Sequence, residues 1–167
     1  MMKVRDTEKV NTKEQIERFI EFSLGKEFYA IPLLTVKEVI AVPKMTPIPN
    51  APAYFEGIMN LRGRVISVID LRKKLKIAAG EDLTEEAVII LDFKQIHIGI
   101  IVDMVHTVLT LSKSQISPAP EGDFKSNNES FKGVVSDDKK MTVILDIVKT
   151  LELHKFPSTA EPSSSVA

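Results

Sequence analysis

The residues that most often perform chemistry are scattered along this chain, and none of them stands at a catalytic spacing. The histidines are His97, His106 and His154, and there is no cysteine. No pair of histidines has the spacing of metal ligands on one helix, and thiolate ligands are excluded. The chain contains neither the Gly-x-Ser-x-Gly elbow of serine hydrolases nor a glycine-rich phosphate loop. We therefore interpret the histidines as packed or surface side chains, and expect no enzyme activity, no metal and no cofactor.

Two aspartates, Asp70 and Asp146, lie at matching places in a segment that occurs twice. Residues 57–75 (GIMNLRGRVISVIDLRKKL) match residues 133–151 (GVVSDDKKMTVILDIVKTL) at one offset, which pairs the two aspartates. Upstream echoes, at a slightly different offset, pair Ala30 with Gly99, Ile31 with Ile100, Val36 with Val105 and Val39 with Val108. A duplication of this size predicts two similar sub-barrels or sub-sheets packed together. The alternative is a chance alignment of two apolar β-type segments.

Each aspartate of this pair directly precedes a short segment that can form a helix. A carboxylate at such a position accepts hydrogen bonds from the unpaired N–H groups of the first helical turn. We expect Asp70 to cap a helix through Leu75, and Asp146 to cap one through Leu153. An acid repeated at both copies of one corner indicates a structural role rather than a catalytic one.

The two copies differ most at a hairpin tip. The first copy has Asn60-Leu61-Arg62-Gly63, and the second has Ser136-Asp137-Asp138-Lys139. A duplicated scaffold that keeps its core and changes one tip is expected to have specialised that tip. The five guanidinium donors of Arg62 are suited to a carboxylate partner. The alternative interpretation is a turn that drifted after the duplication.

The elements that position these residues are short β-type runs separated by turn signals. The expected strands are Ile16–Leu24, Phe28–Ile31, Val36–Val42, Gly57–Leu61, Arg64–Ile69, Ala87–Phe93, Ile96–Val102, Val105–Leu111, Phe131–Ser136 and Lys140–Leu145. The runs around residues 90 and 100 are continuously apolar, which is typical of strands buried on both faces. The fold class is therefore expected to be mainly β, with two small barrels of about five strands each and short helices at equivalent corners.

The length of 167 residues suits one domain, or two interlocked halves that share a core. We expect a flexible N-terminal segment at 1–15, a folded domain at 16–155 and a disordered tail at 156–167. The two sub-barrels would span roughly 16–85 and 86–155, with exchange of strands between them allowed.

Composition limits the classes of function. The net charge is −1 with acids and bases interspersed, no apolar run is long enough to span a membrane, and the N-terminus lacks a secretory signal. These features favour a soluble cytoplasmic protein. A small β-barrel that binds nucleic acid is the alternative. The near-neutral charge, two tyrosines and absence of tryptophan speak against it, because such proteins need basic surfaces and stacking aromatic rings.

The segment GIMNLRGRVISVIDLRKKL resembles the signature of the CheW family of coupling proteins in bacterial chemotaxis. The resemblance extends over FIEFSLGKEFYAIPLLTVKEVI, PKMTPIPNAPAYFEGIMNLRG, GIIVDMVHTVLTLSKSQISPAP and FKGVVSDDKKMTVILDIVKTL. It implies two intertwined SH3-like five-stranded β-barrels with short helices, and no enzymatic activity. The same domain occurs in the CheA kinase and in CheV. No kinase module precedes residue 16 and no receiver domain follows residue 155, so the stand-alone coupling protein is expected.

The resemblance further implies an adaptor that joins the cytoplasmic tip of a methyl-accepting chemoreceptor to the regulatory domain of the CheA histidine kinase. Such a protein is cytoplasmic and recruited to membrane-associated receptor arrays, without inserting into the membrane or binding nucleic acid. Carried over position by position, the receptor-facing groove between the halves would involve Val36, Glu38, Gly57, Arg62, Gly63, Gly99 and Gly133. Within it we expect Glu38 to pair with Arg62. The alternative is two independently solvated side chains.

Overall fold

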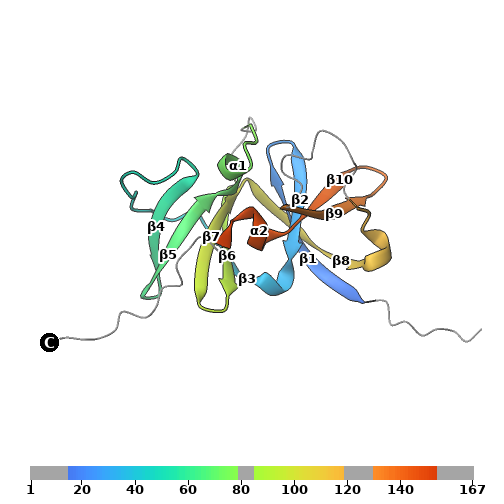
Figure 1. Cartoon of the computed structure of the whole chain (residues 1–167), viewed down its shortest axis with the longest axis horizontal. Helices are drawn as coiled ribbons and strands as arrows, with labels where there is room; N and C mark the ends of the chain where they lie inside the picture. The colour runs from blue at the N-terminus through green and yellow to red at the C-terminus, as the bar shows by residue number, and fades with distance from the viewer. Residues whose placement is uncertain (1–14, 79–84, 119–129, 154–167) are drawn as a thin grey trace, which may run out of the picture.

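Two five-stranded sheets lie side by side in the computed structural model, which describes residues 15–78, 85–118 and 130–153 (Figure 1). The strands are β1 Ile16–Leu24, β2 Glu27–Pro32, β3 Val36–Ala41, β4 Phe55–Leu61, β5 Arg64–Asp70, β6 Ala87–Phe93, β7 Ile96–Val102, β8 Met104–Ser112, β9 Phe131–Ser136 and β10 Met141–Leu145. The helices are α1 Leu71–Lys74 and α2 Ile147–Thr150, with 3-10 turns at Leu33–Thr35 and Lys113–Gln115. The expected N-terminal segment, apart from Gln15, and the expected tail lie outside the described residues.

The sheets are related by the sequence repeat, and each takes strands from both halves of the chain. The first sheet has the order β8-β1-β2-β10-β9, and the second has the order β3-β6-β7-β5-β4. Replacing each strand by its repeat equivalent converts one order into the other. The registers agree as well, since Val68 lies opposite Gly99 in the second sheet and Ile144 lies opposite Ala30 in the first. The duplication is therefore confirmed as two equivalent sheets built by reciprocal exchange of strands.

The mainly β fold class is confirmed, but the expected barrels are not closed by strand ladders in the described part of the chain. A single bridge spans the open side of each sheet: Thr46 pairs with Ile58, and Ser117 pairs with Val134. In the second sheet the segment after β3 carries prolines at 43, 47, 49 and 52. Proline has no N–H to donate to a ladder, so this segment cannot continue as a strand alongside β4.

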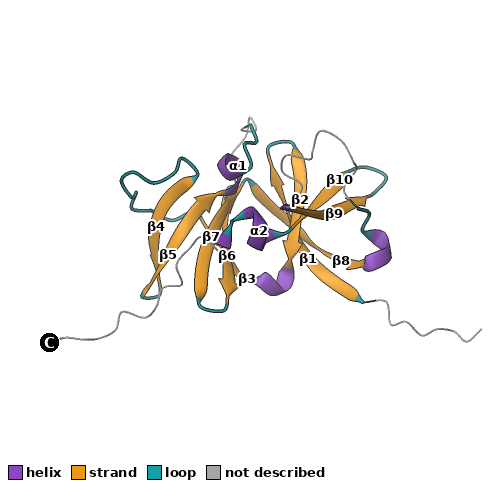
Figure 2. Ribbon diagram, in the orientation of Figure 1, coloured by secondary structure: helices purple, strands orange, loops and turns teal. Residues whose placement is uncertain are grey.

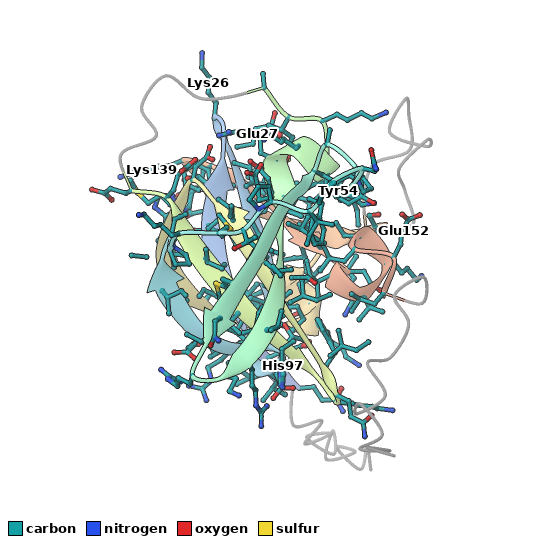
Figure 3. All side chains as sticks on the ribbon, turned by 90° about the vertical axis from the view of Figure 1, so that its left-hand side faces the viewer. Lys26, Glu27, Tyr54, His97, Lys139 and Glu152 are labelled. Carbon is teal, nitrogen blue, oxygen red and sulfur yellow. The ribbon has the colours of Figure 1, made fainter. Side chains whose placement is uncertain are left out.

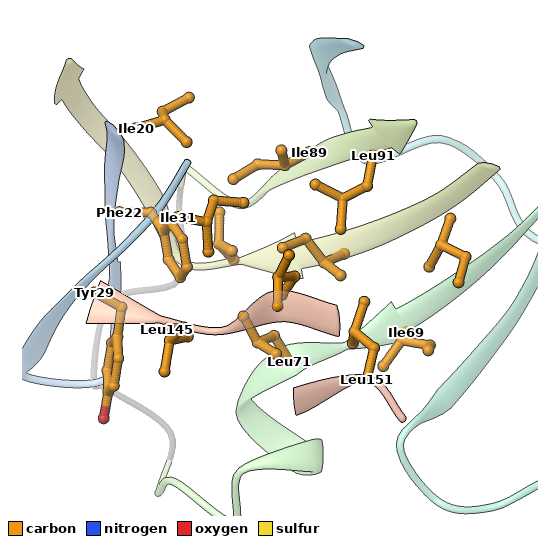
Figure 4. Close-up of a cluster of buried hydrophobic side chains, with 14 of the residues drawn as sticks. Ile20, Phe22, Tyr29, Ile31, Ile69, Leu71, Ile89, Leu91, Leu145 and Leu151 are labelled. Atoms are coloured by element: carbon orange, nitrogen blue, oxygen red, sulfur yellow. The ribbon is translucent and has the colours of Figure 1, made fainter. Parts of the chain in front are cut away.

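The largest hydrophobic cluster lies between the sheets and takes side chains from both (Figure 4). Its fully buried members include Phe22 and Ile31 of the first sheet and Ile69, Leu91 and Ile100 of the second. A smaller cluster lines the interior of each sheet. The apolar run of β6 is buried on both faces, as predicted, because successive side chains reach the shared core and the sheet interior in turn.

Both aspartates of the repeat cap short helices, which lie at equivalent corners (Figure 2). Oδ1 of Asp70 accepts a hydrogen bond from Lys73 N at 3.1 Å, and Oδ1 of Asp146 accepts one from Lys149 N at 3.2 Å. The second helix ends at Thr150 rather than continuing through Leu153 as expected. The reason is local, because Glu152 adopts a left-handed φ of 50°, a conformation that terminates helices.

Because the core is shared, truncating a buried side chain at either of two equivalent positions should lower the stability of the protein to a similar extent. Ile69→Ala and Leu145→Ala each remove a side chain that is fully buried between the sheets. Each substitution is expected to lower the free energy of unfolding by about 2–5 kcal/mol, measured by urea denaturation. Val65→Ala, on the same strand as Ile69 but 67% exposed, is the matched control and should change stability by less than about 0.5 kcal/mol. A neutral result at either buried position would contradict the shared core.

Candidate partner-binding surface

An arginine–glutamate pair stands at the tip of the second sheet. Nη1 and Nη2 of Arg62 donate to Oε1 and Oε2 of Glu38, each at 2.9 Å. Two parallel hydrogen bonds of this kind fix the relative orientation of a guanidinium and a carboxylate. The Arg62 side chain is 71% exposed and that of Glu38 is 21% exposed. The expected pairing therefore forms, and most of the guanidinium surface still faces solvent.

The hairpin between β4 and β5 sets the position of this arginine. Leu61 pairs with Arg64, so the loop consists of two residues, Arg62 and Gly63. Both have positive φ, 52° and 82°, as a type I′ hairpin turn requires. The side chain of Asn60 reinforces the turn by accepting a hydrogen bond from Gly63 N at 2.9 Å. The turn thus places Arg62 at the end of the hairpin, 24 residues along the chain from its carboxylate partner.

A pocket of about 200 Å³ lies beside this pair, within the second sheet. Its lining comes from the five strands and the hairpin turn of that sheet: Lys37, Glu38, Leu61, Arg62, Arg64, Ile66, Ile90 and His97. Nη1 of Arg64 lies 2.7 Å from Nε2 of His97. A guanidinium has only donors, so Nε2 accepts and the imidazole proton sits on Nδ1 in this geometry. This pocket, which we call the tip pocket, is walled mainly by cations and aliphatic side chains.

Sequence reasoning missed the participation of His97, which it interpreted as an ordinary packed or surface histidine. His97 and Arg64 are 33 residues apart and belong to no recognisable motif. They meet because β5 and β7 run parallel, with Ser67 opposite Ile98. Nδ1 of His97 is buried and has no hydrogen-bond partner among the described residues, and the nearest carboxylate oxygen, from Asp92, lies 3.5 Å away. No spacing rule could have found this contact.

Three of the four glycines predicted for the partner-facing groove permit close packing, each at a separate place. Gly57 has a φ of 145°, and a Cβ at this position would overlap the carbonyl oxygen of Thr46. A Cβ at its repeat equivalent, Gly133, would lie 2.6 Å from the carbonyl oxygen of Ser117 in the other sheet. A Cβ at Gly99 would meet a methyl group of Val88 at 2.8 Å.

Of the seven predicted residues, Glu38, Arg62 and Gly63 come together at one tip. The half-buried side chain of Val36 packs instead against the shared core. Gly57 and Gly133 lie where the bridging segments cross each sheet, and Gly99 lies in the middle of β7. Their role in binding a partner therefore stays a prediction.

A second concave surface lies on the first sheet. It has a volume of about 500 Å³ and is lined by Lys26, Glu27, Phe28, Tyr29, Phe131, Val134, Lys139, Lys140, Met141 and Val143. Burial raises the pKa of Tyr29 above its usual value, and the nearby Glu27 carboxylate raises it further. His97 lies at one end of the molecule, whereas Lys26 and Lys139 lie at the other (Figure 3). These lining residues of the two concave surfaces therefore lie at opposite ends of the molecule.

Two further absences concern the described part of the chain. No group of three or more histidine, cysteine, aspartate or glutamate residues there could hold a metal ion. No helix among these residues has the length and apolar character needed to cross a bilayer.

Comparison with known proteins identifies the family. The model of the CheW-like domain matches residues 18–155. The chain belongs to the CheW family. It is 37% identical over 140 residues to the chemotaxis protein CheW of Klebsiella aerogenes, covering 84% of each chain. It is 35% identical over 142 residues to the chemotaxis protein CheW of Bacillus subtilis, covering 85% of this chain and 91% of the relative.

A solved structure supports the same assignment. The scaffolding protein TtCheW from Thermoanaerobacter tengcongensis superposes with a TM-score of 0.70 at 33% identity, covering 78% of this chain and 84% of that one. This CheW-family chain is thus a chemotaxis scaffold protein. The resemblance found in the sequence is confirmed.

The glycine geometry yields a paired test of two backbone positions in the β4–β5 hairpin. Gly57→Ala combines a strained backbone with a steric overlap and is expected to cost about 2–5 kcal/mol of folding free energy. Gly63→Ala adds a Cβ that meets nothing within 4 Å, so it should cost only the strain of a positive φ, about 1–2 kcal/mol. Thermal and urea denaturation of both variants measure the difference. Equal losses would show that the approach of Thr46 to Gly57 is not the limiting contact.

Proposed function

We propose that this chain is a non-enzymatic coupler that binds the cytoplasmic tip of a chemoreceptor at one surface and the regulatory domain of the CheA kinase at another. Membership of the CheW family supports this role. The observation that carries it is the exposed, bidentate Glu38–Arg62 pair, held on a hairpin tip where the other copy of the repeat has Asp138 instead of arginine. The protein acts in the cytoplasm, where receptor arrays recruit it.

The pair suits recognition better than stabilisation. Exposed ion pairs contribute only about 0–1 kcal/mol to folding, so the hairpin gains little stability from it. However, a guanidinium already held in one orientation loses less conformational entropy when a partner binds. The three guanidinium N–H donors that Glu38 does not use, together with the exposed face of Arg62, are then available to an approaching receptor helix.

The placement of the two concave surfaces supports binding of two partners at once. The tip pocket belongs to the second sheet, and the larger surface to the first. Because residues that line the two surfaces lie at opposite ends of the molecule (Figure 3), a receptor bound at one surface leaves the other accessible. A scaffold of this kind does not need a high affinity for either partner, because many weak contacts made at the same time hold an array together.

Binding to each partner alone tests the proposal. The purified chain is expected to bind a soluble receptor cytoplasmic fragment and the isolated CheA regulatory domain, each with a dissociation constant on the order of micromolar, by isothermal titration calorimetry. Single-stranded DNA and RNA are the control ligands. Tight nucleic-acid binding that weakens steeply with salt, without binding to either protein, would overturn the proposal in favour of the nucleic-acid alternative.

A double-mutant cycle tests the role of the pair. Arg62→Ala and Glu38→Ala should each weaken receptor binding while leaving stability and most of the kinase binding unchanged. The double variant should lose less than the sum of the single losses, because removing either side chain already disorders the other.

Strictly additive losses would eliminate the pairing and keep the shared surface. Wild-type receptor affinity in both single variants would eliminate the surface as well. Lys113→Ala, a substitution at an exposed position of the 3-10 turn after β8, serves as the control for nonspecific effects of charge.

A further inference from the structure

We propose that the tip pocket binds one acidic side chain of a partner, with Arg64 as the principal cation. The identification of that partner as the chemoreceptor rests on the proposed function. The binding chemistry itself rests on the internal repeat, because the first sheet already holds a carboxylate at the equivalent place.

The equivalence follows from strand register. Glu21 of β1 lies opposite Ala30 on one side and Thr107 on the other. Its counterpart in the second sheet, Ile90 of β6, lies opposite Gly99 and Glu38. The offset between Glu21 and Ile90 is the same as the one that relates their neighbours. The two sheets therefore have equivalent strand pairing at this point but carry different side chains.

In the first sheet the chain fills this place with its own carboxylate. Glu21 is fully buried, with Oε1 2.5 Å from Nζ of Lys140 and Oε2 accepting a hydrogen bond from Oγ1 of Thr142 at 2.8 Å. Nζ of Lys140 also lies 4.5 Å from the centre of the Phe28 ring. That ring packs against His106, with centroids 5.1 Å apart. The site is thus occupied and covered.

In the second sheet the cation is kept and the carboxylate is missing. Arg64 stands at the position of Lys140, and His97 stands at the position of Phe28. Ile90 carries no charge, and within the described residues no carboxylate contacts Arg64. The space that Glu21 and its neighbours close in the first sheet is here the tip pocket.

Charge and size limit what enters this pocket. Its lining includes Lys37, Arg62 and Arg64 against one acid, Glu38, whose two oxygens are already bound by Arg62. The site therefore favours an anion. At about 200 Å³ it is smaller than the ~300–1,000 Å³ of typical small-molecule sites, and suits the end of one side chain.

Arg64 can supply the hydrogen bonds that such a ligand needs. It has five guanidinium N–H donors, and the contact with His97 uses one of them. Two parallel N–H groups bind a carboxylate in the forked geometry that Glu38 and Arg62 already show next to it. An acidic residue of the partner would thus occupy the place in the second sheet that Glu21 of this chain occupies in the first.

The first experiment uses N-acetylglutamate as a small carboxylate probe, with sodium chloride at equal ionic strength as the reference. Nuclear magnetic resonance should show saturable shifts of the His97 ring signals and of the Arg64 side chain. Arg64→Met keeps most of the aliphatic stem but removes the donors, and should abolish the His97 shifts. Arg18→Met, the same change at an exposed position of β1, is the matched control and should leave them unchanged.

The second experiment measures the affinity of the receptor cytoplasmic fragment. Arg64→Met should weaken binding by about tenfold and lower its salt dependence, since one charge-assisted contact is lost. Arg64→Lys should recover part of the affinity, because lysine provides the cation of the equivalent site without the forked donors. Arg18→Met should bind like the wild-type chain.

The outcomes separate the two proposals. Wild-type receptor affinity in Arg64→Met overturns the receptor carboxylate as the occupant, whether or not the probe binds. Absence of a probe-induced shift at His97 overturns the site itself, even if the receptor binds. If the probe binds but the receptor does not, the carboxylate site stands and the coupling proposal fails.

Discussion

The shared core between the sheets is the constraint on which the rest of the structure depends. Neither half of the chain forms a complete sheet, because each contributes two or three strands to a sheet finished by the other. The fully buried Ile31, Ile69, Ile100 and Leu145 come from both halves and from four different strands. Folding one half alone would leave this apolar surface in water, so the two halves are stable only together.

This constraint explains why the proposed binding surfaces lie at the tips and openings of the sheets. Side chains in the shared core have equivalents in the other half, and a change on one side disturbs the packing of both. Positions at a hairpin tip or a pocket wall face solvent and can change at little cost. Arg62 against Asp138 is a difference of this kind between equivalent positions, whereas Ile90 and Glu21 differ at an equivalent position that is buried in both sheets.

Much of this arrangement could be predicted from the sequence. Four strands, β1, β6, β7 and β9, have the expected bounds. In β6 and β7 the cause is a continuous apolar run between turn signals, which leaves little choice. Both helix starts followed from Asp70 and Asp146, since capping is a local interaction. The helix ends were harder, because a left-handed residue such as Glu152 has no side-chain signature. The contact of Arg64 with His97 depends on the parallel pairing of β5 and β7, which no local pattern encodes.

Co-sedimentation with receptor-containing membranes tests the central claim, that one chain holds receptor and kinase together, most directly. The CheA regulatory domain is mixed with the membranes in the presence and absence of this chain, and the pellet is assayed for all three proteins. The account predicts that the chain increases the amount of kinase domain in the pellet, and that the chain and the kinase domain sediment together. If the receptor instead displaced the kinase domain from the chain, the two would share one surface, and the coupling account would be contradicted.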